Sequence, residues 1–214
     1  MDEIKIALGK GRLEKFTLQA LQEMGIEFPE LKKGSRKLIF NDTEDKIRIV
    51  LVKASDVPTY VENGAADIGF VGKDTLLEQG ADVFEVLDLG FGKCKFAVAG
   101  LPDQATKPNQ KLTVATKYPK VAKNFYNNKG VSVETIYLNG SVELAPLIGL
   151  SDVIVDIVET GRTLKENGLV VLEDISEISA RLIVNKASFK TKTERIHSFI
   201  NQLDDLLKKH SIQN

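Results

Sequence analysis

Short apolar runs alternate with amphipathic stretches along most of the chain, which is the pattern of an α/β protein. Ile4, Ile6 and Leu8 predict a first strand, and the apolar residues between 13 and 24 recur at helical spacing. Further strands are expected at 38–40, 47–52, 68–71, 112–115, 131–138, 153–155, 169–172 and 181–184. Further helices are expected at 56–64, 74–80, 119–127, 142–150 and 191–210, and the stretch 83–101 should be mostly extended.

Residues 152–164 combine a buried strand with polar chemistry. The apolar run 153–155 is typical of a strand inside a parallel sheet, and it ends in a carboxylate at Asp156. In such sheets ligands bind beyond the carboxyl ends of the strands. The loop that follows offers a glycine for close backbone approach, hydroxyls, a cation and a helix start: Thr160, Gly161, Arg162 and Thr163. This chemistry suits a phosphate.

Two carboxylates beside this loop indicate what else the ligand carries. Asp156 and Glu159 would repel a phosphate, whereas carboxylates suit sugar hydroxyls or a Mg²⁺ ion. An acid next to a phosphate loop therefore describes a sugar phosphate, with or without pyrophosphate. The alternative is an ordinary strand, turn and helix with polar turn residues.

A second strand-to-helix turn, at residues 9–12, is basic instead of acidic. Lys10 and Arg12 are flanked by Gly9 and Gly11, and they are candidates to meet the phosphates of another ligand or a leaving pyrophosphate. The alternative is a solvated turn with surface cations. Further basic residues near predicted strand ends are also candidate anion contacts, although each alone is more often a surface charge: Arg36, Lys53 and Lys73.

Composition narrows the class of protein. The 214 residues include 43% hydrophobic and 28% charged residues, as in soluble globular proteins. A net charge of -1 gives no broad basic field, so we expect neither a nucleic-acid nor a membrane partner. Cys94 is the only cysteine, which excludes an intrachain disulfide. The first residues resemble no signal segment and no apolar run reaches membrane-spanning length, so a cytoplasmic location is expected.

The histidines and one internal similarity add two further expectations. His197 and His210 both fall in the last predicted helix and are expected on its surface, so histidine acid–base catalysis is not expected. The segments 64–74 and 149–156 share a plan in which a glycine ends a helix and an aspartate opens a buried strand. This similarity suggests two similar lobes, although coincidence is the alternative. We expect lobe I at 1–91 plus 184–214 and lobe II at 92–183.

Residues 143–164 resemble the signature of the ATP phosphoribosyltransferase family. The matching residues are Glu143-Leu144-Ala145-Pro146-Leu147, Gly149, Asp152 and Val155 to Leu164. Other segments are similar to further family segments in the same order: 9–12, 35–38, 54–58 and 64–69. The resemblance implies the first step of histidine biosynthesis, in which ATP and phosphoribosyl pyrophosphate, with Mg²⁺, give phosphoribosyl-ATP and pyrophosphate. It also implies an α/β, two-lobed fold like the type II periplasmic binding proteins, with the active site in the inter-lobe cleft.

The resemblance is to the short form of this family. Such members lack a C-terminal histidine-binding domain and work with a separate regulatory subunit similar to histidyl-tRNA synthetase. A homodimer that assembles with this subunit is therefore expected.

The resemblance also implies roles for the candidate residues. Thr160, Gly161, Arg162 and Thr163 would hold the 5-phosphate, Asp156 the ribose hydroxyls, and Glu159 the ribose or a metal-bound water. We expect Arg12 and Arg36, supported by Lys10 and Lys53, to stabilise the leaving pyrophosphate. Nucleotide binding is assigned to a further set: Gly9, Gly11, Asp67, Gly72 and Lys73. The metal ligands stay open.

Three other functions are alternatives for this sequence. One is a phosphoribosyltransferase of nucleobase salvage, which would use a similar acid and phosphate loop with another acceptor. A second is a cytosolic solute-binding protein with the same two-lobed fold, which would need no cations for a leaving group. A third is an interaction module, against which the two polar strand-end loops argue.

Overall fold

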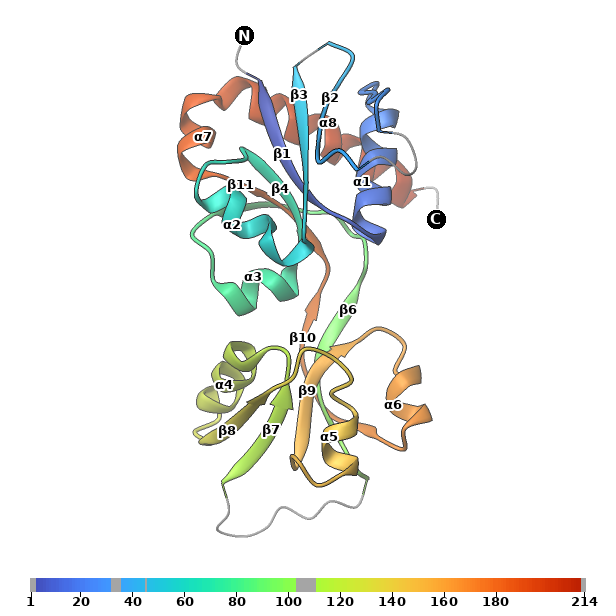
Figure 1. Ribbon diagram of the computed structural model, residues 1–214, viewed down its shortest axis with the longest axis vertical. Coiled ribbons are helices and arrows are strands. Elements are labelled where there is room, and N and C mark those ends of the chain that lie inside the picture. Colours follow the sequence, from blue (N-terminus) through green and yellow to red (C-terminus); the bar gives the residue numbers. More distant parts are fainter. Residues whose placement is uncertain (1–2, 32–35, 45, 103–110, 213–214) are drawn as a thin grey trace. The chain divides into compact units, whose positions relative to one another are not determined.

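The computed structural model describes residues 3–31, 36–44, 46–102 and 111–212, and these form two compact units (Figure 1). Unit 1 comprises Met1–Leu76, Gly80–Gly92 and Ser179–Asn214, and unit 2 comprises Leu77–Gln79 and Lys93–Ile178. We expected the chain to return to the first lobe at residue 184. The return falls at Ser179 instead, because the strand Ala180–Val184 pairs inside the sheet of unit 1.

In the described part of unit 1, a six-stranded sheet has the order β2-β3-β1-β4-β11-β5. Its strands are β1 (Ile4–Gly9), β2 (Ile39–Asn41), β3 (Ile47–Val52), β4 (Ile68–Gly72), β5 (Phe84–Asp88) and β11 (Ala180–Val184). β1 pairs in parallel with β3 and β4, whereas β2 and β11 run antiparallel to their neighbours. The two strands expected at 38–40 and 47–52 are thus present, as the antiparallel pair β2–β3.

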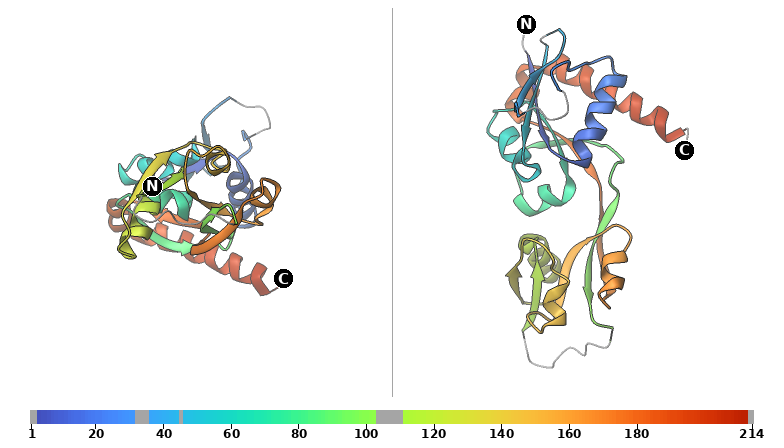
Figure 2. Two further views of the ribbon diagram at one scale, coloured as in Figure 1. Left: turned by 90° about the horizontal axis from the view of Figure 1, so that it is seen from below. Right: turned by 45° about the vertical axis from the view of Figure 1, so that its right-hand side comes forward.

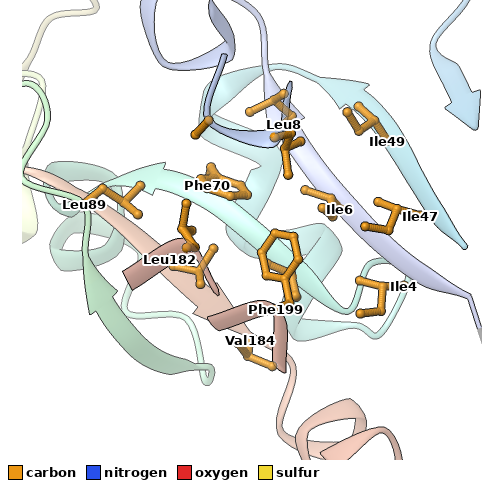
Figure 3. Packing of buried hydrophobic residues seen from close by; sticks show 14 of the residues in the cluster. Ile4, Ile6, Leu8, Ile47, Ile49, Phe70, Leu89, Leu182, Val184 and Phe199 are labelled. Carbon is orange, nitrogen blue, oxygen red and sulfur yellow. The ribbon is translucent and has the colours of Figure 1, made fainter. Parts of the chain in front are cut away.

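Helices cover both faces of this sheet (Figure 2). On one face lie α1 (Arg12–Glu23) and α8 (Thr193–Ile212), whose apolar side chains pack on alternate residues of the strands (Figure 3). On the other face lie α2 (Val57–Glu62) and α3 (Lys73–Gln79). Leu21 of α1 and Leu203 of α8 are fully buried, and burying each contributes about 1.5–3 kcal/mol.

Over the described residues, unit 2 has a five-stranded sheet in the order β10-β6-β9-β7-β8. Its strands are β6 (Cys94–Gly100), β7 (Leu112–Thr116), β8 (Val133–Tyr137), β9 (Val153–Val158) and β10 (Val170–Ile178). One face packs against α4 (Pro119–Asn128), and the other against α5 (Leu144–Leu147) and α6 (Arg162–Glu166). β7 pairs in parallel with β8 and β9, while β6 runs antiparallel to β9.

The two units share one local construction, which supports the similarity seen in the sequence. In unit 1 the order β3-β1-β4 matches β8-β7-β9 in unit 2. Just before β4, the Asp67 carboxylate accepts the Lys5 N–H at 2.8 Å; just before β9, the Asp152 carboxylate accepts the Thr113 N–H at 2.8 Å. Each aspartate therefore fixes the start of its strand against the neighbouring parallel strand.

Several predicted elements differ from those observed. β9 extends to Val158, because Ile157 and Val158 pair with β6, so Asp156 lies inside the strand and not at its end. β10 runs to Ile178 rather than ending near 172, because β6 offers a full-length antiparallel partner. The helix expected at 142–150 is only the short α5, which ends before Gly149 at a positive φ of 73°.

The last predicted helix is also divided. α7 (Lys186–Thr191) precedes α8, and the Asn185 side chain caps α7 by accepting the Ser188 N–H. The Thr191 hydroxyl, at the end of α7, donates back to the Ala187 carbonyl at 3.0 Å.

Asp67 ties the C-terminal helices to the sheet. Its carboxylate is buried and accepts the Ser188 hydroxyl at 2.6 Å and the Lys192 ammonium at 2.8 Å, besides the Lys5 N–H. Asp67 also lies at the amino end of β4, opposite the end that leads to Lys73. The prediction that Asp67 binds the nucleotide is therefore wrong, because its carboxylate is buried, occupied and at the other edge of the sheet.

Replacing Asp67 with alanine should lower the free energy of unfolding by about 3 kcal/mol, because the Lys5 N–H would lose its acceptor and the Lys192 ammonium its carboxylate, leaving it only the Glu3 carbonyl. Chemical denaturation of the two proteins measures the difference. Asp82→Ala is the matched control, since it removes the exposed Asp82–Lys186 pair and should cost much less. Equal losses in the two variants would contradict the role given to Asp67.

Candidate active site at the carboxyl edges of the two sheets

In unit 2, the carboxyl ends of β7, β8 and β9 meet at one edge of the sheet, since these strands are parallel. A depression of about 260 Å³ opens where β9 ends. Its lining consists of one residue at the start of α5 and a continuous segment through the predicted phosphate loop: Glu143 and Asp156 to Leu164. The structure thus brings together every residue predicted to bind the sugar phosphate.

The loop after β9 presents hydroxyls and backbone to this depression. Gly161 has a positive φ of 71°, a conformation that favours glycine, and it caps the short helix α6. Thr160 and Thr163 are exposed, and the Arg162 N–H approaches the Thr160 hydroxyl at 3.4 Å. The Arg162 guanidinium donates to the exposed Glu166 carboxylate at 2.8 Å.

Asp156 is half-buried and faces a second carboxylate. Burial raises the pKa of Asp156, the charge of Glu143 raises it further, and the Ile157 N–H and the Lys117 charge lower it only in part. The side chain therefore resists ionisation in the free protein. Our sequence reasoning assigned no role to Glu143 or Lys117. Glu143 stands 13 residues before Asp156 in the chain, and only the packing of α5 beside β9 brings them together.

In unit 1, the same geometry gathers the predicted cations. Lys10 follows β1, Lys53 follows β3 and Lys73 follows β4, and these parallel strands end at one edge of the sheet. Arg36 precedes β2, which runs antiparallel to β3, so it also comes to this edge. Arg12 is the first residue of α1, directly after the β1 turn. All except Lys73 are exposed.

Two glycines of this edge have structural reasons. A Cβ on Gly9 would lie 2.5 Å from the Cα of Ala54, so only glycine lets the turn after β3 approach β1. Gly11 has a φ of 134°, and its N–H donates to the Glu14 carboxylate at 3.1 Å. A Cβ on Gly72 would meet only the flexible end of the Asp74 side chain, which can move aside. Gly9 and Gly11 therefore shape the turn that carries Lys10 and Arg12.

Three further observations concern the histidines, possible metal ligands and membrane-spanning helices. His197 and His210 are both exposed on α8, as predicted, and His210 pairs with Glu23 at 2.8 Å. Within the described ranges, no group of three or more His, Cys, Asp or Glu side chains is placed to hold a metal ion. No helix in the part of the chain that the structure describes is long and apolar enough to cross a membrane.

The Asp156→Asn variant should have a higher Tm than the wild type at neutral pH, because the amide removes a half-buried charge beside Glu143. The folded pKa lies above the usual 3.8, so ionisation destabilises the folded state, and this penalty is complete above the folded pKa. The gain should shrink as the pH falls through the folded pKa and disappear below 3.8.

Calorimetry from neutral to acidic pH measures this gain. Asp152→Asn is the control: its carboxylate accepts a backbone N–H, so the amide should bring no gain. A lower Tm for Asp156→Asn at neutral pH would contradict the strain assigned to Asp156.

Comparison with known proteins places this geometry in a family. The chain is 54% identical to an ATP phosphoribosyltransferase of Bacillus cereus (strain 03BB102) over 204 residues, which are 95% of this chain and 97% of the relative. It is 56% identical to the enzyme of Alkaliphilus metalliredigens (strain QYMF) over 203 residues, with the same shares.

Solved structures agree with the fold. The ATP phosphoribosyl transferase (HisG:HisZ) complex from Thermotoga maritima gives a TM-score of 0.85 at 38% identity, over 96% of this chain and 99% of that chain. The periplasmic aliphatic sulphonate binding protein SsuA from Escherichia coli gives 0.62 at 14% identity, over 100% of this chain and 71% of that chain. The second likeness concerns the fold alone. The two together confirm the predicted fold class, and the first confirms the resemblance to the short form.

The family model described as ATP phosphoribosyltransferase matches residues 53–205, which include both the cations after β3 and β4 and the loop after β9. Together with relatives more than half identical over nearly the whole chain, this match shows that the chain belongs to the ATP phosphoribosyltransferase family.

Proposed function

We propose that this chain transfers the phosphoribosyl group of phosphoribosyl pyrophosphate to ATP, which gives phosphoribosyl-ATP and pyrophosphate in the first step of histidine biosynthesis. The observation that carries the proposal is the depression of unit 2, where a half-buried carboxylate adjoins a loop of hydroxyls and backbone N–H groups. Such a site is complementary to a ribose that carries a phosphate.

The donor roles follow from the lining of the depression. The loop from Thr160 to Thr163 binds the 5-phosphate through its hydroxyls and backbone, which carry no negative charge. Asp156 accepts hydrogen bonds from the ribose hydroxyls, and Glu143, which also lines the depression, takes part in the same contact. Glu159, another lining residue, assists at the ribose. The ribose hydroxyls donate hydrogen bonds to Asp156 and so favour its ionised form. Binding of phosphoribosyl pyrophosphate therefore relieves part of the free-energy cost of burying this carboxylate.

The cations of unit 1 bind the leaving pyrophosphate and the phosphates of ATP. The attacking ring nitrogen of adenine has a free lone pair, so the step needs no strong general base. Negative charge instead develops on the leaving pyrophosphate, where fixed cations stabilise the transition state. Arg12 and Arg36 are our candidates for this role, with Lys10 and Lys53 in support. Lys73, with the turns that contain Gly9, Gly11 and Gly72, is assigned to the ATP phosphates.

Mg²⁺ would enter the site bound to the phosphates of the substrates. This ion commonly binds the phosphates of its ligand together with one or two protein carboxylates. Asp156, Glu143 and Glu159 are carboxylates of the required kind at the donor site. When bound, the ion neutralises pyrophosphate charge.

The proposal extends to assembly and location. The Thermotoga maritima relative was solved as a HisG:HisZ complex, which supports a separate second subunit for this chain too. We propose a homodimer that binds a regulatory subunit similar to histidyl-tRNA synthetase, in the cytoplasm.

The first test mixes the purified chain with ATP, phosphoribosyl pyrophosphate and Mg²⁺, with pyrophosphatase added to draw the reaction forward. The near-ultraviolet absorbance of N1-substituted adenine should rise only when all three components are present. A rise that needs an added regulatory subunit would make activity dependent on assembly. Product formation from free nucleobases instead of ATP, or binding of ligands without any turnover, would contradict the proposal.

Arg36→Ala should lower kcat about 10²–10³-fold, the effect expected for loss of one preorganised group that stabilises transition-state charge. Steady-state kinetics in the same assay measures this effect. Arg48→Ala is the matched control, because Arg48 pairs with Glu3 at 2.9 Å and lies along β3 away from the carboxyl edge. An unchanged kcat in Arg36→Ala would remove Arg36 from the leaving-group role.

A further inference from the structure

Lys73, the cation that follows β4, is already engaged by a carboxylate of the same unit. Its ammonium forms an ion pair with Glu85 of β5. The two side chains are 26% and 34% exposed, whereas the Lys186–Asp82 pair of unit 1 is 43% and 74% exposed. Lys73 is therefore held more firmly than an ordinary surface lysine.

Glu85 is fixed in turn by an arginine on the neighbouring strand. The Arg181 guanidinium lies 2.9 Å from the Glu85 carboxylate and is only 15% exposed. Its other side pairs with Asp88 and donates to the Ser179 hydroxyl at 2.7 Å. The Ser179 hydroxyl donates to Asp88 at 2.7 Å, which closes the network. Glu85 thus lies between two cations, with Arg181 at one carboxylate oxygen and Lys73 at the other.

This arrangement makes Lys73 exchangeable. Glu85 is shared between two cations, so if Lys73 turned to a phosphate, Glu85 would keep Arg181 as its partner. Arg181 would likewise keep Asp88. Breaking the Lys73–Glu85 pair therefore leaves no buried charge unpaired, which is the costly outcome for ion pairs. A polyphosphate that reaches the carboxyl edge of unit 1 competes with Glu85 for Lys73.

We propose that Glu85, which also pairs with Arg181, is a positioning residue. It holds the Lys73 ammonium in an ion pair when no nucleotide is bound, and so weakens binding of the ATP polyphosphate. This inference rests on the proposed function and deepens it. Glu85 acts through Lys73 and touches no substrate. The nucleotide must displace the carboxylate, so the pair sets part of the apparent affinity for ATP. It sets none of the affinity for the donor, because Lys73 is assigned to the ATP phosphates and not to the leaving pyrophosphate.

Glu85→Gln tests this competition without removing the network. Glutamine keeps the size of Glu85 and a carbonyl oxygen beside Arg181, and the Arg181–Asp88 pair stays, so the fold should be kept. The variant should bind ATP about fivefold more tightly, the effect of losing one partly exposed competing pair. Isothermal titration with MgATP, together with the KM for ATP and for phosphoribosyl pyrophosphate, measures the change. The KM for the donor should stay the same.

A double-mutant cycle shows whether the effect passes through Lys73. Lys73→Gln alone should weaken ATP binding, and adding Glu85→Gln to it should change affinity less than about twofold. Asp82→Asn, which frees Lys186 of a more exposed ion pair in the same unit, is the control and should leave both KM values unchanged.

The outcomes separate the inference from the proposed function. An active wild type in which Glu85→Gln leaves ATP affinity unchanged, or tightens ATP and donor equally, would overturn the inference alone. Tightening that persists in the Lys73→Gln background would also overturn it, because Glu85 would then act by its general charge. A wild type that neither binds ATP nor forms product would overturn the proposed function and the inference together.

Discussion

Parallel strand pairing is the constraint on which the site depends. Within unit 1, three strands run parallel: β1, β3 and β4. Within unit 2, the same holds for β7, β8 and β9. In each unit, residues far apart in sequence therefore come to a common edge of its sheet. In unit 1 this pairing gathers cations, and in unit 2 it gathers a carboxylate and a phosphate loop. An aspartate at the amino end of the third strand, Asp67 or Asp152, fixes each parallel pair at its other edge.

The two edges differ in how their charges are compensated. Asp156 lies beside Glu143 in a half-buried setting, so the free protein bears a cost that the proposed ribose ligand would relieve. In unit 1, Lys73 is paired with Glu85, and under the proposed function the nucleotide would have to take it from that partner. Without a ligand, the unit 2 site therefore holds a carboxylate whose ionised form is unfavourable, whereas the Lys73 charge of unit 1 is already paired. The distinction follows from burial and pairing, and both sites use groups that the turns after the strands hold in place.

Much of this fold could be predicted from the sequence, because alternating apolar runs and glycine-ended helices show directly as patterns. Strand ends were less accessible. Asp156 lies inside β9, since the pairing that extends the strand comes from β6, more than fifty residues earlier. Asp67 lies five residues before Gly72, yet the length of β4 puts them at opposite edges. The approach of Glu143 to Asp156, and of Arg181 to Glu85, depends on tertiary packing that no local pattern reveals.

The central claim is that the sugar-phosphate donor binds at the carboxyl edge of unit 2 and the nucleotide polyphosphate at that of unit 1. Amide chemical-shift mapping of the isotopically labelled chain tests this division directly, with Mg²⁺ present and each substrate added alone. Phosphoribosyl pyrophosphate should shift the amides of 156–163, and ATP should shift those of 9–12, 53–54 and 72–74. Donor shifts confined to the unit 1 turns, or ATP shifts confined to 156–163, would contradict the account.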